Sequence, residues 1–439
     1  MDIPAFVMTI IKRLHSRGFG AYVVGGAIRD MFLGRPAIDW DVATSASTDK
    51  VRELFHDIRS FALKHETATL VCSGHHYEIT TVRGSGDFEQ RIEEDLGHRD
   101  FTINAMAYDI ESDTVLDPNG GREDIAGKIV RAVGDPVERF REDPVRLLRA
   151  VRIAVELGFR IENRTMETIH GMSDQLALAA RERVRDEFMK ILMSQKPSDG
   201  FRILRRSNLL SQFLPELLEG FRKKQNFHHR HTIYRHIMET IDRVEPAPVL
   251  RLAALFHDIA KPRVRRKIEG EFRFFDHAQE SAFLAGEIMA RLRFSREMIK
   301  EVTNLIEHHM INYDTKWSDG AIRRLVRRVD PENMDSLISL RGADLSARGD
   351  IDGKLTLLSE LKKRVEKLRK ESIINDTGDL AVGGEKIMDI LEIPAGPDVG
   401  RVLKILLEKV TDHPYLNTEE RLTDILKDIR DKKIVDKSV

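Results

Sequence analysis

The sequence predicts an α+β head, a small mixed sheet with helices, on a long all-α body. Two observations predict this division. Up to about residue 135, short apolar runs bounded by glycine indicate strands. After Phe140, apolar residues recur at i, i+3 and i+4, which is the period of amphipathic helices. The chain has 439 residues, enough for two to four domains at roughly 100–200 residues each.

In the head, strands are expected at 21–24, 38–42, 67–72 and 76–82, and helices at 4–16 and 48–57. The last two strands flank a Ser73-Gly74 turn and form a hairpin. Beyond the head, helices are expected at 145–157, 165–176, 182–193 and 233–244. We divide the chain into a head (1–138), a helical neck (139–225), a helical body (226–350) and a helical tail (351–439).

Composition is that of a globular protein, with 41% hydrophobic and 33% charged residues. The net charge of −1 gives no sign of a nucleic-acid partner. No apolar run reaches the roughly 18 residues of a membrane span, and Lys12 and Arg13 favour an amphipathic first helix over a signal peptide. The single cysteine, Cys72, excludes an intrachain disulfide. We expect a cytoplasmic monomer or homodimer with no membrane partner.

A phosphate-binding turn is expected where the first strand ends in Gly25-Gly26 and a helix begins. Glycine lets a ligand approach the backbone closely, and the free N–H groups of a helix start bind anions. Arg29 lies one turn into that helix, within reach of a triphosphate. The alternative is an ordinary turn.

Three carboxylates form the candidate catalytic site. Asp39 and Asp41 stand at i and i+2 on a predicted strand, so both point to one face and Trp40 to the other. Side by side they repel unless a cation neutralises them, and hard oxygen ligands select Mg²⁺. Two such ions would activate a 3′-hydroxyl and stabilise a pyrophosphate leaving group. Glu78 is a candidate third carboxylate, and a solvated sheet edge is the alternative for the aspartates.

Ordered motifs run through most of the chain. They are G-G-A-I-R-D-M-F-L-G at 25–34, D-W-D at 39–41, E-I-T-T-V-R at 78–83, E-D-L-G-H-R-D-F-T-I-N-A-M-A at 94–107, D-P-N-G-G-R-E-D-I at 117–125, E-D-P-V-R-L-L-R-A-V-R at 142–152 and E-R-V-R-D-E-F-M-K-I-L at 182–192. On these motifs the chain resembles the bacterial and eukaryotic class of tRNA nucleotidyltransferases, the CCA-adding enzymes and their poly(A) polymerase relatives. The resemblance implies transfer of nucleotides from CTP or ATP to the tRNA 3′ end, without a nucleic-acid template.

The resemblance also implies roles for nucleotide-binding residues. Arg99 and Asp100 would lie near the sugar and phosphates of the nucleotide, and an aspartate suits a ribose hydroxyl as acceptor. We include Asn104 in this set without assigning it a role. His98 stands where the family usually has a second arginine, so the role of that arginine is in doubt here.

The resemblance makes Glu142-Asp143-x-x-Arg146 the nucleotide-selecting motif. We expect Asp143 and Arg146 at i and i+3 on one helix, sharing a face. The carboxylate would accept from the exocyclic amine of cytosine or adenine, and the guanidinium would donate to the ring nitrogen. Uracil and guanine would leave buried polar groups unpaired. Arg149 and Arg152 continue the stripe toward phosphates or solvent, and a surface ion pair is the alternative for Asp143 and Arg146.

Nucleotide specificity is suggested by a shortened segment. Only residues 84–93 separate the third and fourth motifs, where most relatives carry a longer flexible loop associated with the change from C to A addition. The short segment resembles the CC-adding specialists. We therefore favour CC addition over complete CCA addition, with A-only addition or poly(A) synthesis as further alternatives.

The body carries L-F-H-D-I-A-K-P at 255–262, which resembles the HD phosphohydrolase signature. Its ligand pattern is matched by His236, His257, Asp258 and Asp344. Imidazole and carboxylate together suit Mn²⁺, Ni²⁺ or Co²⁺, or Mg²⁺ with more oxygen ligands, for hydrolysis of phosphoesters at RNA 3′ ends. His277 and His308 are candidates to complete a second metal site. The alternative is a helical body that only supports tRNA.

Clusters of basic residues are candidate RNA contacts, because phosphate contacts can hold a tRNA by shape and charge. The first follows the His-Asp motif and the second lies along a predicted helix: Lys261, Arg263, Arg265 and Arg266; Arg323, Arg324, Arg327 and Arg328. A third lies at 362–370, and His228, His229 and His231 are structural or face RNA. Solvated helix faces are the alternative. The helical tail is expected to bind tRNA.

Overall fold

The computed structural model describes residues 3–58, 60–62, 67–72, 74–82, 84–225, 231–349, 353–369 and 376–436. Its contacts divide the chain into two compact units. The first consists of Met1–Leu218 with Arg291–Arg293, and the second of Glu219–Ala290 with Phe294–Val439. The four-part division made from the sequence is finer than these units and stays a prediction. Within the described ranges, no helix is long and apolar enough to cross a membrane.

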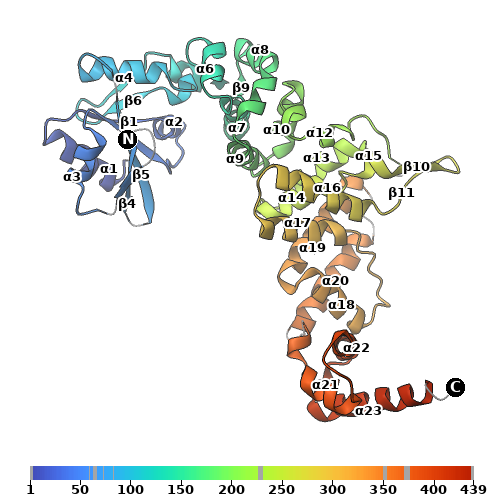
Figure 1. Ribbon diagram of the computed structural model, residues 1–439. Helices are drawn as coiled ribbons and strands as arrows, with labels where there is room; N and C mark the ends of the chain where they lie inside the picture. The colour runs from blue at the N-terminus through green and yellow to red at the C-terminus, as the bar shows by residue number, and fades with distance from the viewer. Residues whose placement is uncertain are drawn as a thin grey trace. The chain divides into compact units, whose positions relative to one another are not determined.

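A seven-stranded mixed sheet organises the first unit, with strand order β3-β4-β5-β2-β1-β6-β7. Figure 1 labels β1, β4, β5 and β6 in the N-terminal part of the chain. The strands are β1 (Ala21–Val24), β2 (Trp40–Thr44), β3 (Ser60–Ala62), β4 (Thr67–Cys72), β5 (His75–Thr81), β6 (Ala107–Asp109) and β7 (Thr114–Leu116). Neighbouring strands are antiparallel except β2 and β5, which are parallel. This confirms the predicted mixed sheet and the β4–β5 hairpin, while β3, β6 and β7 were not anticipated.

The helices of the head are α1 (Ala5–His15), α2 (Gly26–Phe32), α3 (Thr48–Leu54), α4 (Phe88–Gly97) and α5 (Gly121–Ala126), with a 3₁₀ turn η1 (Thr102–Asn104). Two of these helices, α3 and α4, have side-chain N-caps. The predicted helices at 4–16 and 48–57 are confirmed as α1 and α3. At the start of α4, Asp87 and Gln90 form a capping box, in which each side chain bonds the other's backbone N–H. This fixes the entry into α4 directly after the sheet.

The rest of the first unit is a group of helices with one short strand pair. They are β8 (Ile129–Val130), α6 (Pro136–Glu142), α7 (Arg146–Leu157), β9 (Arg160–Ile161), α8 (Asn163–Gly171), η2 (Ser173–Leu178), α9 (Arg181–Leu192), α10 (Pro197–Arg206), α11 (Leu210–Phe213) and α12 (Pro215–Leu218). α7 packs against both α9 and α10. The single helix predicted over 165–176 is wrong, because α8 ends at Gly171 and a 3₁₀ segment follows.

The second unit is helical apart from one hairpin. Its elements are α13 (Ile233–Arg243), α14 (Pro248–Phe256), α15 (Lys261–Val264), β10 (Arg265–Ile268), β11 (Glu271–Phe274), α16 (His277–Arg291), α17 (Arg296–His308), α18 (Asp319–Val329), η3 (Pro331–Asn333), α19 (Met334–Arg348) and α20 (Lys354–Arg369). The hairpin departs from the predicted all-α body. Its turn residues, Glu269 and Gly270, both have positive φ, as the tight turns that match the twist of a hairpin require.

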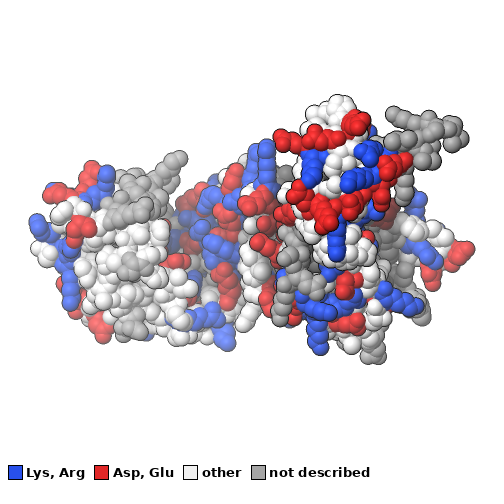
Figure 2. Space-filling model, turned by 90° about the horizontal axis from the view of Figure 1, so that it is seen from below, with Lys and Arg blue, Asp and Glu red and all other residues white. Residues whose placement is uncertain are grey.

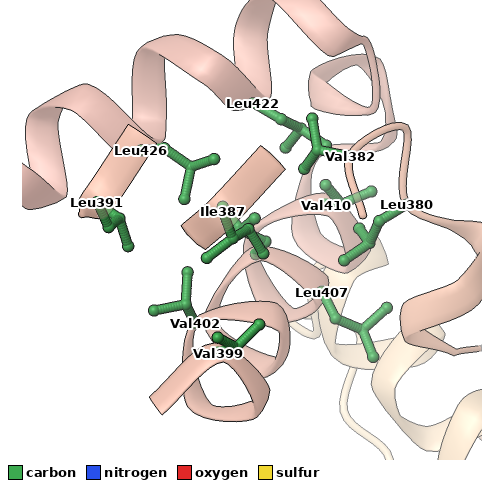
Figure 3. Close-up of a cluster of buried hydrophobic side chains, with 11 residues drawn as sticks. Leu380, Val382, Ile387, Leu391, Val399, Val402, Leu407, Val410, Leu422 and Leu426 are labelled. Carbon is green, nitrogen blue, oxygen red and sulfur yellow. The ribbon is translucent and has the colours of Figure 1, made fainter. Parts of the chain in front are cut away.

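The tail helices have an apolar core of their own (Figure 3). They are α21 (Gly384–Leu391), α22 (Pro397–Asp412) and α23 (Glu419–Asp436), with 3₁₀ turns η4 (Thr377–Asp379) and η5 (Pro414–Leu416). The buried side chains are Leu380, Val382, Ile387, Leu391, Val399, Val402, Leu406, Leu407, Val410, Leu422 and Leu426. Contacts between α18 and α22 join this tail to the rest of the second unit.

Candidate active site and metal centre

Three carboxylates gather on the head sheet. The parallel pairing of β2 with β5 sets Asp41 directly beside Glu78. Asp39 lies immediately before β2, not on a strand as predicted, and Trp40 between the aspartates is buried. Burial raises the pKa of Asp41 to about 6, with Glu78 and Asp39 adding to the rise and Arg99 opposing it. Carboxylates this crowded fit a divalent cation, which would relieve their repulsion.

The backbone of the turn before α2 lies close to the Asp41 carboxylate. Gly25 has a φ of +81°, a conformation that favours glycine. A Cβ at this position would lie 3.1 Å from Asp41 Oδ2 and 3.2 Å from an Arg99 terminal nitrogen. From the sequence, glycine is expected here so that a ligand can approach the backbone. The structure adds a second reason, because the side chains of Asp41 and Arg99 leave little room for a Cβ.

Arg29 is held in place on α2 by two partners. Its guanidinium donates to both carboxylate oxygens of Asp30 at 3.0 Å and to Asn104 Oδ1 at 2.8 Å. The Asn104 side chain in turn donates to Asp100 Oδ1 at 3.1 Å. Asn104 therefore joins Arg29 to Asp100, a positioning contact that the sequence had left without a role.

Asp100 is buried at the junction of the sheet and α7. Its Oδ1 also accepts the backbone N–H of Phe101 at 2.8 Å, and its Oδ2 accepts from Arg149 at 3.1 Å. Arg99 donates to Asp95 at 3.2 Å. Both neighbours, Arg99 and Asp100, line the same cleft.

A cleft of about 760 Å³ opens beside the carboxylates within the first unit. It is lined by Gly25, Gly26, Arg29, Asp30, Pro36, Ile38, Asp39, Asp41, Asp95, His98, Arg99, Asp100, Asn104, Arg146, Arg149, Arg152, Glu156 and Lys190. Most of the predicted nucleotide-binding residues are on this wall, together with both aspartates. The lining combines a carboxylate end with several guanidinium groups, which suits a polyanion bound through metal ions and arginines.

Two arginines of α7 are held by a carboxylate of α9. Arg149 and Arg152 both donate to the buried carboxylate of Glu187, at 3.4 and 2.7 Å. Arg149 remains charged because Asp100 and Glu187 outweigh its burial and raise its pKa. Sequence reasoning missed Glu187 and Lys190 as parts of this site. Both lie within the quoted motif at 182–192, so the signal was present.

Asp143 and Arg146 do not share a helix, which corrects the prediction. α6 ends at Glu142 and α7 begins at Arg146. Asp143 is extended, with φ −146° and ψ 98°, because the residue before a proline avoids the helical region. Its carboxylate pairs with Arg183 at 2.7 and 2.9 Å. Although burial raises the pKa of Asp143, this pairing holds it below its usual value.

Arg146 has its own partners. It donates to Glu142 Oε2 at 2.9 Å and to the backbone oxygen of His98 at 3.1 Å. Of the two members of the expected base-reading pair, only Arg146 lines the cleft described above. The Arg146 N–H donates to the backbone oxygen of Asp143 at 3.0 Å, but the two side chains are bonded to different groups of the first unit.

The link between β5 and α4 is short. β5 ends at Thr81 and α4 begins at Phe88. Gly84 and Gly86 both have positive φ and lie against side chains of α4. Arg83, the last residue of the third quoted motif, lies outside the described residues.

In the second unit, the four predicted ligands come together from three elements. His236 is on α13, His257 and Asp258 follow α14, and Asp344 is on α19. His236 Nε2 lies 3.1 Å from His257 Nε2, 3.3 Å from Asp258 Oδ2 and 3.0 Å from Asp344 Oδ1. All four side chains are buried, and one ligand atom from each lies within 4.8 Å of the others. This donor set suits a divalent transition metal.

A second group of possible ligands shares Asp258 and includes His277 and His309. The prediction of His308 is corrected here. α17 ends at His308, and its side chain lies on the wall of a cleft, whereas His309 is fully buried at the helix C-cap. Burial lowers the pKa of His309 to about 3, so its imidazole is neutral, as a metal ligand must be.

Cations surround the buried carboxylates of this cluster. Lys261 Nζ lies 2.6 Å from Asp258 Oδ2, and Arg348 donates to both oxygens of Asp344 at 2.8 and 2.9 Å. Burial raises the pKa of Asp258, but His257 and Lys261 outweigh it and hold that pKa well below its usual value. Lys261 is 3% exposed, so its predicted contact with RNA is wrong.

The other basic residues of the predicted RNA contacts differ in their exposure and in their partners within the chain. Arg323 is buried, which corrects its prediction, and Arg324 and Arg327 bond Asp412 and Thr411 of α22. Arg263 pairs with Glu219, and Arg265 stacks on Phe272 at 3.5 Å. Arg266 and Arg328 are exposed. On the face drawn in Figure 2, basic and acidic side chains are intermixed. His228 and His229 lie outside the described residues.

Comparison with known proteins matches three consecutive families. They are a poly(A) polymerase head domain at residues 21–131, a probable RNA- and SrmB-binding site of polymerase A at 158–220, and an HD domain at 231–345. A CC-adding tRNA nucleotidyltransferase of Thermus thermophilus is 33% identical over 88% of this chain and 89% of its own length. A CCA-adding enzyme of Streptococcus thermophilus is 28% identical over 94% of each chain.

Among solved structures, the CCA-adding enzyme of Bacillus stearothermophilus in complex with CTP is similar over the full length of both chains. The TM-score is 0.74 and the sequence identity 27%. A mixed sheet with clustered carboxylates beside an arginine-lined cleft, joined to helices of this kind, defines an enzyme of the nucleotidyltransferase class. The identity to the Thermus protein across nine-tenths of both chains makes the assignment specific, since chance similarity does not extend so far. The chain belongs to the tRNA nucleotidyltransferase and poly(A) polymerase family, with a C-terminal HD domain.

Proposed function

We propose that the protein adds C residues from CTP to the tRNA 3′ end and stops at CC, leaving the final A to a separate enzyme. The observation that carries this proposal is the short link from Thr81 to Phe88. The capping box at Asp87 fixes the start of α4, which leaves little chain for a flexible loop. The Thermus relative, named a CC-adding enzyme, supports the same reading.

The reacting groups are assigned to the carboxylate end of the cleft. Asp39, Asp41 and Glu78 would hold Mg²⁺, which would neutralise the repulsion that adds to burial in raising the pKa of Asp41. When bound, these ions supply activation of the tRNA 3′-hydroxyl and charge neutralisation on the pyrophosphate that leaves. Gly25, Gly26 and Arg29 hold the triphosphate.

Asp100 accepts from a ribose hydroxyl, which favours NTP over dNTP. Arg99 and Arg149 flank it, and Arg152 extends the basic wall along α7. Because Asn104 ties Arg29 to Asp100, the triphosphate and sugar ends of the nucleotide are held by one connected set of side chains. This connection orients the nucleotide before the tRNA end arrives.

Base selection belongs to Asp143 and Arg146. Asp143 is bonded to Arg183 at 2.7 and 2.9 Å and does not line the cleft, so it must move to accept from the amine of a cytosine bound there. Nucleotide binding is therefore coupled to a rearrangement between α6, α7 and α9. Arg183→Gln frees the Asp143 carboxylate from this partner and should change the ratio of CMP to UMP incorporation, whereas Arg181→Gln, a neighbour at the start of the same helix, serves as the control.

The test of nucleotide specificity uses three tRNA transcripts, which end before CCA, in C and in CC. Each is incubated with CTP, ATP or both in Mg²⁺ and read on a sequencing gel. Products that stop at CC, with no A added to the CC-ended tRNA, support the proposal. If all three transcripts reach CCA, the short link does not limit addition and the CC-only proposal fails. Long A tails would indicate a poly(A) polymerase.

A second proposed activity is phosphoester hydrolysis at RNA 3′ ends by the HD cluster. The four buried ligands His236, His257, Asp258 and Asp344 support it. The test offers 2′,3′-cyclic and 2′-phosphate-ended RNA with Mn²⁺, Ni²⁺, Co²⁺ or Mg²⁺. Asp344→Asn should abolish hydrolysis and leave nucleotide transfer intact, and Asp39→Ala should do the reverse. Hydrolysis that survives Asp344→Asn would exclude this cluster.

Binding of tRNA is assigned to the second unit, through its exposed basic residues and the tail. Arg266 and Arg328 are exposed, as are Arg263, which is paired with Glu219, and Lys362, Lys363 and Lys367 of the third cluster. Exposed phosphate contacts of this kind weaken with salt. Each substitution to Gln should therefore lower tRNA affinity and flatten its salt dependence, as measured by filter binding.

A further inference from the structure

The β10–β11 hairpin carries two arginines directly opposite each other. Arg266 on β10 is in register with Arg273 on β11, so the two side chains leave the same face of the hairpin. Both side chains of this arginine pair are exposed, and in the described part of the chain neither guanidinium has a hydrogen bond or ion pair. Like charges placed directly opposite destabilise a hairpin. This face is therefore expected to bind an anion from outside the chain.

The other face of the hairpin is different, because its cations have partners within the chain. The Arg265 guanidinium lies 3.5 Å from the centroid of the Phe272 ring, and Lys261 Nζ lies 5.6 Å from that of Phe274. Both contacts are cation–π interactions. An acidic residue, Glu271, lies on the same face as the arginine pair but nearer the turn, and it forms no ion pair with either arginine within the described residues.

The arginine pair lies next to a cleft that leads to the HD cluster. Phe275, two residues after Arg273, lines a cleft of about 580 Å³ together with Trp317 and His277. The Phe275 ring is 53% exposed. His277 Nε2 lies 3.5 Å from Asp258 Oδ1 of the cluster. Cations, exposed aromatic rings and the buried cluster therefore follow one another along this part of the second unit.

Cations beside exposed aromatic rings are typical of a surface that binds single-stranded nucleic acid. Arginines hold the backbone phosphates, and bases stack on the rings. A phosphate also supplies the negative charge that would relieve the repulsion between the two guanidinium groups. Neither Arg266 nor Arg273 lines the cleft, so a ligand that contacts both the pair and the cleft must extend beyond the cleft. Figure 1 shows the hairpin extending beyond α15 and α16, where such a ligand has access to it.

We propose that Arg266 and Arg273 together hold one backbone phosphate of a single-stranded RNA whose 3′ end lies in the cleft beside the HD cluster. The substrate of the cluster is then an RNA strand in preference to a free nucleotide. The inference rests on the proposed hydrolysis of RNA 3′ ends by this cluster. It adds Arg273, which the basic clusters predicted from the sequence did not include.

Binding is measured first, with the full-length chain in EDTA, so that hydrolysis does not contribute. The probe is a 5′-fluorescein cytidine tetranucleotide that ends in a 2′,3′-cyclic phosphate, and its fluorescence anisotropy is followed at several salt concentrations. Arg266→Gln and Arg273→Gln should each lower the affinity about 5-fold. Because both arginines hold the same phosphate, the double variant should lose less than the product of the single effects. Its slope of log affinity against log salt should fall in magnitude by about 0.7, the value for one phosphate of a single strand.

Lys267→Gln is the matched control, because Lys267 is an exposed cation of the same strand on the opposite face. It should change the affinity much less than either arginine substitution. Circular dichroism melting checks folding, and loss of either arginine should not lower the melting temperature, because it relieves the repulsion. Hydrolysis with Mn²⁺ is measured next. The arginine variants should raise KM for the tetranucleotide more than KM for 2′,3′-cyclic CMP, which has no backbone phosphate to reach the pair.

Equal losses of affinity in Lys267→Gln and in the arginine variants would overturn the proposal, since only general charge would then be involved. Unchanged affinity would overturn it as well. Single effects that multiply fully in the double variant would show that the arginines do not share a phosphate, which also overturns the assignment. If binding changes as expected but the unsubstituted chain hydrolyses neither substrate, the proposed hydrolysis fails and the phosphate contact stands.

Discussion

Replacing Asp41 by Asn should stabilise the metal-free head, even though Asp41 is at the centre of the proposed catalytic site. The pKa of this carboxyl rises from 3.8 to about 6, first through burial and then through Glu78. At about 1.4 kcal/mol for each pKa unit, the ionised side chain costs the folded state up to about 3 kcal/mol. Asn keeps the shape and removes the charge.

The direction in which stability changes with pH follows from proton binding to Asp41. Between the unfolded value of 3.8 and the folded value of about 6, the folded state binds more protons, so the free energy of unfolding falls as the pH rises. Above about pH 6 the full penalty is present. The gain from Asp41→Asn should therefore be largest at about pH 8, shrink as the pH falls through 6, and vanish below 3.8.

Trp40, buried beside Asp41, reports unfolding of the head once the chain's other tryptophan is removed by Trp317→Phe. Urea titrations in EDTA at about pH 8 compare this background with the Asp41→Asn variant. Asp49→Asn is the control, because that carboxylate is 96% exposed. Mg²⁺ should stabilise the background and not the Asp41→Asn variant. Equal stability of the two proteins in EDTA, or an equal response to Mg²⁺, would refute the reasoning.

Three further substitutions test other parts of the structure. Gly25→Ala should lower CMP incorporation at least about 10-fold, because its Cβ would lie 3.1 Å from the Asp41 carboxylate. Gly34→Ala is the control for backbone strain, because Gly34 also has a positive φ, +63°, but has open space around it. Arg149→Ala should cost about 1–3 kcal/mol of head stability and most transfer activity, measured by melting and gel assay, since it removes one charged partner from each of Asp100 and Glu187, which keep Asn104 and Arg152. Leu406→Ala should cost about 2–5 kcal/mol within the tail and speed amide exchange in α22, and unchanged exchange would contradict the packing.

The sequence placed Asp41 and Glu78 on strands because strand period is local, whereas Asp39 lies just before β2 and not on it as predicted. Once β2 and β5 were recognised as strands, their alternation fixed which side chains share a face, and only the parallel register had to be supplied by the fold. The prediction that Asp143 and Arg146 share a helix was wrong, although a local signal against it was present. Pro144 follows Asp143, and a residue before proline rarely continues a helix.

The direction of the His308 and His309 side chains and the burial of Lys261 depend on tertiary packing, which a local sequence pattern does not predict. His308 and His309 are adjacent, and one step along a helix end rotates a side chain by about 100°. Which of them points inward depends on how α17 packs on α14, a contact between distant segments. The burial of Lys261 has the same origin, since it depends on Asp258 and on Gln225 at 3.4 Å. A charge run in a sequence does not reveal which of its members has a buried partner.

The ion pairs of Lys261 and Arg348 with the buried aspartates have a consequence for when the HD cluster acquires metal. Structural zinc domains stay unfolded until the ion arrives, because nothing else balances their ligands. Here the negative charge is already balanced by side chains that fold with it. The second unit can therefore mature during synthesis without metal and take up ions later. Its metal content would then follow the supply of ions in the surroundings, and not the moment at which the chain was made.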